Sequence, residues 1–459
     1  MASTSINRTN SSASGTTWTV SCWVKQCQPT ADGGIFQFYQ NGSNVISLYS
    51  NPIVKFRAFI SDGYSAGDLT LNVSKRDPNA WSHYVAVCDT TNSTAADRWR
   101  LYINGDRVDD DSSLVASKTN PSSSYSFSPA VSGEFNLGAY FSNFSYHNYA
   151  HVHYCDGYAY AASNFGSTDS TTGEWKPNTA PSVTYGTNGF FLKFEDRTSL
   201  LTDSSGNNQT MSLSGSGTVT QTIDNPSNNF ATWNTSDRWL GNTAGGEDFL
   251  RNGNTYFRTT SNSQKALVRS TIGVTSGKYY CEMKVTQIER TWVGICNKQI
   301  FTSSSEWWTQ SNNNGLYWYG NGTAMYDAQN NSGNAYGGFV NNDIVMIALD
   351  MDNKALYFGK NGTWQNSGNP ESGATKTGSV TEYSTLTNAS YALENYGEVY
   401  FMAGEPSTAG VGQVQANFGN GYFGTSAISS AGTNASGIGI FEYDVPAGYT
   451  ALSTKGLNL

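Results

Sequence analysis

The sequence predicts an all-β protein that consists of two β-sandwich domains of jelly-roll type in series. Composition is the first observation: the 459 residues include 47 Gly, 28 Tyr, 22 Phe and 12 Trp, and only 13% are charged. Small polar and aromatic residues suit sheets and turns, whereas strong helix formers are sparse. The second observation is a regular succession of short apolar runs that are separated by turn residues. A chain of this length can bury two separate cores.

Seven short aromatic and β-branched runs fill the first part of the chain. The runs are 18–24, 35–39, 45–49, 54–60, 69–73, 81–88 and 99–108. Turn signals such as Asn41-Gly42 and Asn104-Gly105 punctuate them at the spacing of a β-sandwich. The seven runs therefore predict two packed sheets.

The chain is expected to divide into four parts. These are a first sandwich over 1–225, a connector over 226–254, a second sandwich over 255–426 and a C-terminal arm over 427–459. The connector is polar but contains Trp233, Trp239 and Phe249. Flexible tethers rarely carry such aromatic residues, so we expect an ordered connector that packs on one neighbour.

Residues 343–363 predict a β-hairpin in the second sandwich. An apolar strand over 344–349 is followed by turn residues at 350–353 and by a second strand over 356–358. Asn361-Gly362 then gives the signal of a type I′ turn.

The net charge and the lack of long apolar segments argue against nucleic acid and membranes as partners. The 26 Lys and Arg residues against 35 Asp and Glu give a net charge of −9, and no run of basic residues stands out. Nucleic acid is therefore not expected as a partner. The first eight residues lack the features of a secretory signal, and no segment is apolar enough to span a bilayer. We expect a soluble protein without membrane insertion. Its six cysteines lack paired zinc-site spacing and are expected to be buried free thiols.

Two clusters resemble metal sites, and each has a plainer alternative. His151, His153 and Cys155 alternate and would project from one face of a strand, as zinc ligands could, but a structural role in the sheet is favoured. The acidic run 109–111 could hold Ca²⁺, but a solvated acidic turn is favoured. We predict no metal site and no cofactor.

Catalytic patterns are missing from the sequence. Jelly-roll glycosidases need two carboxylates at a fixed separation, often as E-x-D-x-x-E, and no such run occurs. The G-x-S-x-G nucleophile pattern has no counterpart, and all four histidines lie in the N-terminal half. We therefore predict no catalytic residue, and a hydrolase is suggested by fold analogy alone.

An aromatic and amide-rich stretch is the stronger functional signal. Sugars present flat apolar faces edged with hydroxyl groups, so exposed Trp or Tyr beside Asn is a suitable receptor. The candidate ligand-binding residues are Trp307, Trp308, Asn312, Asn313 and Tyr319. Tyr317 and Trp318 are instead expected to lie in the core of a hairpin.

Two family resemblances follow from these motifs. The strand Trp81-Ser82-His83-Tyr84-Val85-Ala86 and the hairpin Leu101-Tyr102-Ile103-Asn104-Gly105 resemble LamG and pentraxin domains of concanavalin A-like fold. The hairpin 343–362, together with residues 271–283, 293–295, 315–322 and 414–419, resembles SPRY (B30.2-like) domains. The SPRY resemblance implies a binding module rather than an enzyme. Because the hairpin 343–362 follows a LamG-like sandwich in a polar chain rich in Gly and Asn, we expect it to be scaffold.

Further motifs resemble virion proteins of tailed bacteriophages. They lie at 156–159, 165–166, 169–177, 189–196 and 203–208, and in the P-x-G-[FY]-x-A-L ending at 446–452. This resemblance implies a structural virion protein: a fibre, spike or head-decoration appendage that takes part in recognition of a host-surface glycan. A purely structural decoration protein and, less favoured, a glycan depolymerase are the alternatives.

The same resemblance sets the expected partners and location. The partners would be other virion proteins of the head or tail and a host-surface polysaccharide. A homo-oligomer is expected, for which a trimer is one closed arrangement. The protein would be made in the bacterial cytoplasm and located in the virion. The jelly-roll pattern begins almost at Met1, so attachment is expected through a folded module, the short N-terminal segment or the C-terminal arm.

Overall fold

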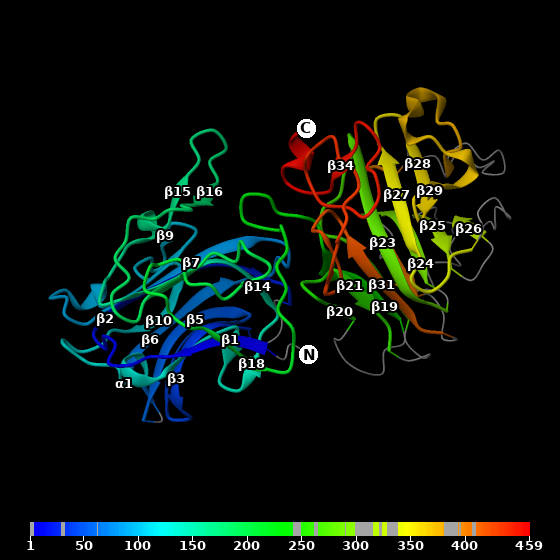
Figure 1. The fold of residues 1–459 in the computed structure, drawn as a ribbon. Helices are drawn as coiled ribbons and strands as arrows, with labels where there is room; N and C mark the ends of the chain where they lie inside the picture. Colours follow the sequence, from blue (N-terminus) through cyan, green and yellow to red (C-terminus); the bar gives the residue numbers. More distant parts are fainter. Residues whose placement is uncertain are drawn as a thin grey trace. The chain divides into compact units, whose positions relative to one another are not determined.

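The chain forms two compact units. The computed structural model describes residues 4–28, 33–61, 63–241, 249–260, 265–289, 291–298, 315–320, 324–327, 338–380, 393, 396–405 and 410–459. Unit 1 comprises residues 1–221 and 225–227, and unit 2 comprises 222–224 and 228–459 (Figure 1). Among these described residues, no helix is both long and apolar enough to cross a membrane.

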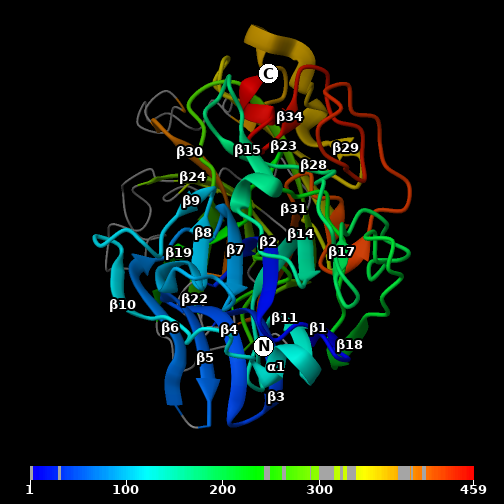
Figure 2. The same ribbon diagram turned by 90° about the vertical axis from the view of Figure 1, so that its left-hand side faces the viewer.

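Two antiparallel sheets make up the described part of unit 1 (Figure 2). The larger sheet has the order β10 (Val115–Thr119), β6 (Gly63–Ser74), β5 (Ile53–Ile60), β4 (Asn44–Asn51), β3 (Gly33–Asn41), β11 (Glu134–Leu137), β1 (Thr4–Thr9), β18 (Ser212–Gly215). The smaller has the order β17 (Phe190–Leu192), β14 (His147–Asp156), β2 (Thr17–Gln26), β7 (Trp81–Asp89), β8 (Trp99–Ile103), β9 (Asp106–Arg107). Short additions are α1 (Ser128–Ser132) and the pairs β12 (Ala139–Tyr140) with β13 (Asn143–Phe144) and β15 (Gly166–Thr168) with β16 (Trp175–Pro177).

The seven predicted runs of unit 1 all form strands. Runs 35–39, 45–49, 54–60 and 69–73 lie in the larger sheet, and the other three lie in the smaller sheet. The Asn104-Gly105 turn between β8 and β9 has positive φ at both residues (51° and 92°), as a type I′ turn requires. All six cysteines are buried free thiols, which confirms that prediction.

The core of unit 1 is built on aromatic rings that the two sheets enclose. Trp99 stacks on Phe56 with ring centroids 3.9 Å apart, and its indole N–H donates to the Phe56 carbonyl at 3.1 Å. Trp18 meets Trp99 and Phe38 edge to face. Such pairs add about 1 kcal/mol each beyond the burial of their area. These rings come from both sheets, so they hold the sandwich together.

Unit 2 is also a sandwich of two sheets in its described residues. One sheet has the order β19 (Trp233–Gly241), β22 (Lys265–Ser270), β30 (Val399–Glu405), β24 (Trp292–Asn297), β25 (Gly315–Tyr319), β26 (Ala324–Asp327). The other has the order β20 (Leu250–Arg251), β21 (Tyr256–Arg258), β31 (Gly412–Asn417), β23 (Lys278–Ile288), β27 (Ile344–Asp350), β28 (Ala355–Lys360), β29 (Thr363–Trp364), and β34 (Thr450–Ala451) pairs with β23. Strands β32 (Tyr422–Phe423) and β33 (Ser426–Ala427) form a small hairpin. The all-β prediction is confirmed.

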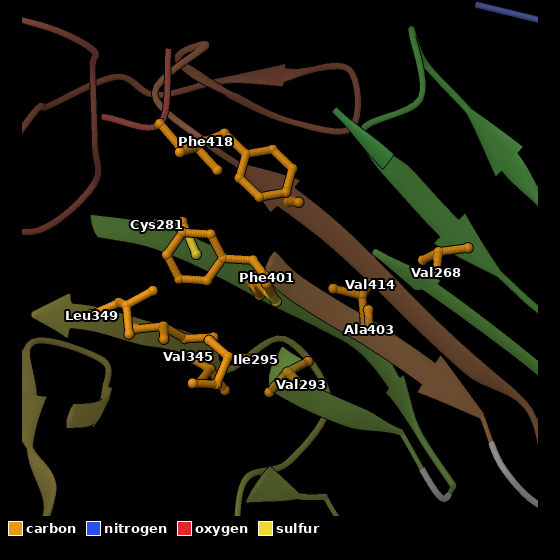
Figure 3. Packing of buried hydrophobic residues seen from close by; sticks show 14 of the residues in the cluster. Val268, Cys281, Val293, Ile295, Val345, Leu349, Phe401, Ala403, Val414 and Phe418 are labelled. Atoms are coloured by element: carbon orange, nitrogen blue, oxygen red, sulfur yellow. The ribbon is translucent and has the colours of Figure 1, made fainter. Parts of the chain in front are cut away.

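Apolar side chains of both sheets of unit 2 meet in one core (Figure 3). Alternate residues of each strand point into it, as the two-residue period of a strand requires. The labelled members are Val268, Val293, Ile295, Phe401 and Ala403 from one sheet, Cys281, Val345, Leu349 and Val414 from the other, and Phe418.

The predicted hairpin 343–363 is observed as β27 and β28. The Asp350 side chain accepts hydrogen bonds from the backbone N–H groups of Asp352 and Asn353 at the turn, and it pairs with Lys278 at 3.0 Å. The Asn361-Gly362 turn has positive φ at both residues and leads into β29. Strand β27 is buried along its whole length, so this hairpin is scaffold within the sandwich.

Residues of the expected connector and of the expected C-terminal arm take part in the sandwich of unit 2. Strands β19 and β20 lie within 226–254 and belong to the two sheets. From the arm, Phe441 and Tyr449 pack on the outer face of the eight-stranded sheet of unit 2, against Tyr280 and Tyr357. The two segments also meet each other, because the Ala231 N–H donates to the Leu452 carbonyl at 2.9 Å.

A buried carboxylate attaches this C-terminal segment to β23. The two Glu282 carboxylate oxygens accept hydrogen bonds from the backbone N–H groups of Glu442 and Tyr443, both at 2.8 Å. They also accept from the Tyr280 hydroxyl at 3.0 Å and from the Asn417 amide at 3.3 Å. Glu282 itself has no exposed surface. Burial raises the pKa of Glu282 to about 7, although the four hydrogen bonds oppose this rise.

This pKa predicts that unit 2 is more stable in mild acid than at alkaline pH. Between its ordinary value of 4.5 and about 7, Glu282 is protonated in the folded state and charged in the unfolded state. The resulting stabilisation is complete below about pH 4.5 and is lost as the pH rises through about 7. Hydrogen-exchange free energies of the β23 and 441–452 peptides, corrected for intrinsic rates, should fall by about 3 kcal/mol over this window. Glu282→Gln should make these free energies nearly independent of pH. If they fall as steeply with pH in this variant as in the wild type, Glu282 is not the cause.

Candidate functional site

A set of aromatic side chains gathers on the outer face of the six-stranded sheet of unit 2. On β24 and β25, Val293, Ile295, Leu316 and Trp318 point into the core, so the alternate residues point the other way. The outward cluster consists of Trp239, Leu267, Trp292, Cys296, Tyr317, Tyr319, Tyr400 and Met402. We call this cluster the aromatic face.

The rings of the aromatic face are ordered by direct contacts. Trp292 stacks on Tyr317 with a centroid distance of 4.3 Å and an angle of 8° between the ring planes. Tyr319 meets Trp292 edge to face at 6.1 Å. Trp292 and Tyr317 are buried, whereas Trp239, Tyr319 and Tyr400 are half-buried. A buried aromatic base therefore supports three more accessible rings.

Two glycines allow close packing of their neighbours on this face. Gly294 is the cross-strand partner of Tyr317 and Met402, and a Cβ atom there would lie 2.2 Å from the Leu316 carbonyl oxygen. A Cβ atom at Gly404 would lie 2.6 Å from the Leu267 side chain. Because Gly294 has no side chain, the Trp292 ring can extend along its strand and reach Tyr317.

A charged pair borders the aromatic face. The Arg269 guanidinium lies over the Tyr400 ring, 4.2 Å from its centroid, and forms an ion pair with Asp237. The guanidinium is largely buried, while the Asp237 side chain is 38% exposed. The Asp237 carboxylate therefore offers hydrogen-bond acceptors beside the rings, which suits a ligand that brings hydroxyl groups.

The accessible rings are spread across the sheet. In the strand register, Tyr319 pairs with Trp292, Trp292 with Gly404, Gly404 with Leu267 and Leu267 with Trp239. Tyr319 and Trp239 are thus separated by four strand spacings, or roughly 19 Å. This span suits an extended chain better than a single small molecule.

The structure describes one of the five predicted ligand-binding residues. Trp307, Trp308, Asn312 and Asn313 lie outside the described residues, in the segment that connects β24 to β25. Tyr319 is at the end of β25 and belongs to the aromatic face.

The expectation that Tyr317 and Trp318 both lie in the core is half correct. Trp318 is in the core, but Tyr317 lies on the opposite face, because neighbouring residues of a strand alternate. Sequence reasoning missed Trp239, Trp292 and Tyr400. Each of them alternates with core residues along its strand, and this pattern could have placed it on the outer face. The strands that carry them are far apart in the sequence, however, so their pairing has no local signal.

A buried serine–histidine pair in unit 1 was not predicted and does not form a catalytic base. His83 Nε2 lies 2.8 Å from Ser21 Oγ, and the Trp175 indole N–H donates to His83 Nδ1 at 3.0 Å. Burial lowers the pKa of His83 to about 3, so the ring is neutral. Because Nδ1 accepts a hydrogen bond, Nε2 carries the proton and donates it to Ser21. A general base would instead accept the proton of the serine.

The histidines and cysteine with metal-like spacing have packed surroundings. His153 stacks on Phe191 at 3.9 Å, and its Nδ1 lies 3.0 Å from the Tyr185 hydroxyl. Cys155 is buried in an apolar cluster, and burial raises the pKa of its thiol. A bulge in β14 gives His151 a positive φ of 47°, so it departs from regular alternation with His153.

The acidic run 109–111 is occupied by protein groups. Asp109 is buried and forms ion pairs with Arg107 at 3.0 Å and Lys118 at 2.7 Å. It also accepts the backbone N–H of Leu101. The Asp111 carboxylate accepts hydrogen bonds from Ser113 within its own turn. These contacts fit the structural interpretation of the run.

Comparison with known proteins gives one family match and two similar solved structures. Residues 2–150 match the family model described as the concanavalin A-like lectin/glucanases superfamily. The chain is similar to the SPRY domain of human HERC1, with 14% identity and a TM-score of 0.28 over 40% of this chain and 96% of that one. It is also similar to the native heptameric SAP-like pentraxin from Limulus polyphemus, with 12% identity and a TM-score of 0.29 over 47% of this chain and 90% of that one. No curated protein sequence matches the chain. A LamG-like, concanavalin A-like domain is therefore present in unit 1.

Proposed function

We propose that this chain is a structural appendage protein of a tailed-bacteriophage virion that recognises a host-surface glycan. The aromatic face of unit 2 carries the proposal for recognition. Stacked Trp and Tyr rings beside the Arg269–Asp237 pair combine apolar and polar contacts, as a sugar ligand needs. The lectin-like family model over residues 2–150 supports the same class of function. The assignment to a phage rests on the sequence motifs between residues 156 and 208 and at 446–452, which resemble those of phage virion proteins.

The proposed role is binding without catalysis. The contacts of His83 support it, since the proton on Nε2 faces Ser21 and leaves no base there. Weak contacts with single sugars gain strength when several copies act together, so we propose a homo-oligomer that binds other virion proteins of the head or tail.

Electron microscopy of phage particles tests the proposed location. Gold-labelled antibodies against the full chain should mark one symmetric position on the head or tail of intact particles. Particles that lack the gene should lose the label and the matching density. A chain found only in infected-cell lysate, and in no particle, would contradict the virion role.

A further inference from the structure

A small pocket opens at one end of the sandwich of unit 1. It has a volume of about 290 Å³ and is lined by Val24, Gln26, Ser74, Lys75, Arg76, Asp77, Ala80 and Ser82. Residues 75–80 connect β6 of the larger sheet to β7 of the smaller sheet. The pocket therefore lies where the chain crosses between the two layers. Its volume is at the lower limit for ligand sites, so it suits one small group.

Lys75 is the central charge of this pocket. Within the described part of the chain its ammonium group donates one hydrogen bond, to the Ser82 hydroxyl at 3.0 Å, and it lies 5.7 Å from the centroid of the Tyr84 ring. Its backbone N–H donates to the Pro52 carbonyl, which fixes the start of the connection. Burial lowers the pKa of Lys75, whereas nearby Asp77 raises it. A half-buried ammonium group with two further N–H donors is a binding group for an anion.

The charges of the lining residues restrict the charge of the anion that can bind. Lys75 and Arg76 against Asp77 give the pocket a formal charge of +1, on a chain whose net charge is −9. A singly charged carboxylate suits this balance better than a phosphate with two charges.

The pocket also offers hydroxyl groups to the ligand. Ser74 and Ser82 line it, and the oxygen of each hydroxyl group can accept a hydrogen bond. A carboxylate alone cannot supply a donor to them, whereas the hydroxyl groups of a sugar acid can.

We propose that this pocket binds one uronic acid residue. Lys75 binds the carboxylate, and Ser74 and Ser82 bind the hydroxyl groups. The site lies in unit 1 and shares no residue with the aromatic face of unit 2. This proposal stands independently of the function proposed above.

Saturation-transfer NMR on the full chain with sodium D-glucuronate tests this site. Glucuronate should bind saturably, while D-glucose, acetate and inorganic phosphate should each bind at least tenfold more weakly. Lys75→Met should weaken glucuronate binding at least tenfold. Lys55→Met is the matched control, because Lys55 also lies 5.7 Å from a tyrosine ring centroid, that of Tyr49, but does not line the pocket. It should leave binding unchanged.

The outcomes separate this site from the aromatic face. Thermal melting verifies that each variant is folded, and Lys75→Gln takes the place of the methionine variant if that one unfolds. Glucuronate binding should persist in Tyr400→Ala, whatever that variant does to polysaccharide binding. Absence of saturable glucuronate binding, equal binding of glucose, or unchanged affinity in a folded Lys75 variant would overturn the proposal.

Discussion

Glu282→Ala should release the C-terminal segment from the outer face of unit 2 and lower the stability of this unit by about 4 kcal/mol. The substitution leaves the N–H groups of Glu442 and Tyr443, the Tyr280 hydroxyl and the Asn417 amide without their acceptor. Each buried donor that loses its partner costs about 1–3 kcal/mol. Exchange of the Glu442 and Tyr443 amide hydrogens should therefore accelerate by roughly three orders of magnitude.

Glu442→Ala is the matched control for this prediction. It removes the same kind of side chain but keeps the backbone N–H that binds Glu282. Its amide exchange should stay within threefold of wild type, while Glu282→Gln should lie between the two alanine variants. If Glu282→Ala protects the segment as well as Glu442→Ala does, the carboxylate does not attach it.

Tyr319→Ala and Tyr400→Ala should each weaken polysaccharide binding about tenfold, and the double variant about a hundredfold. Loss of one stacking contact costs roughly 1.4 kcal/mol, which is a factor of ten in affinity. Both rings are half-buried members of the aromatic face, so their removal should leave the core intact. Biolayer interferometry with immobilised capsular polysaccharides and lipopolysaccharides measures the change.

Tyr64→Ala provides the control for a ring under an arginine. The Arg57 guanidinium lies 4.6 Å from the Tyr64 ring centroid, much as Arg269 lies over Tyr400, but Tyr64 is on the larger sheet of unit 1. This variant should bind like wild type. Equal losses in Tyr64→Ala and Tyr400→Ala would show that stability, and not the aromatic face, determines binding.

The sequence predicted most of the fold because strands and turns carry local signals. The runs 18–24 and 81–88 are short and rich in aromatic and β-branched residues, and Asn104-Gly105 and Asn361-Gly362 supply the backbone conformations that tight turns need. None of these signals requires knowledge of distant residues.

The candidate site depends on long-range pairing, and this limited its prediction. Tyr319 was found because it lies in an aromatic stretch. Trp239 and Tyr400 join it only because β19, β22, β30, β24 and β25 are consecutive in one sheet. Glu282 shows the same limit, since two of its donors are 160 and 161 residues away along the chain.

Equilibrium binding of the full chain to the polysaccharide panel tests the central claim most directly. Glycan recognition through the aromatic face predicts saturable binding to at least one polysaccharide, competition by its free oligosaccharide, and about hundredfold weaker binding in the Tyr319→Ala, Tyr400→Ala double variant. Binding to intact phage heads or tails without binding to any polysaccharide would contradict that claim and favour a purely structural decoration protein.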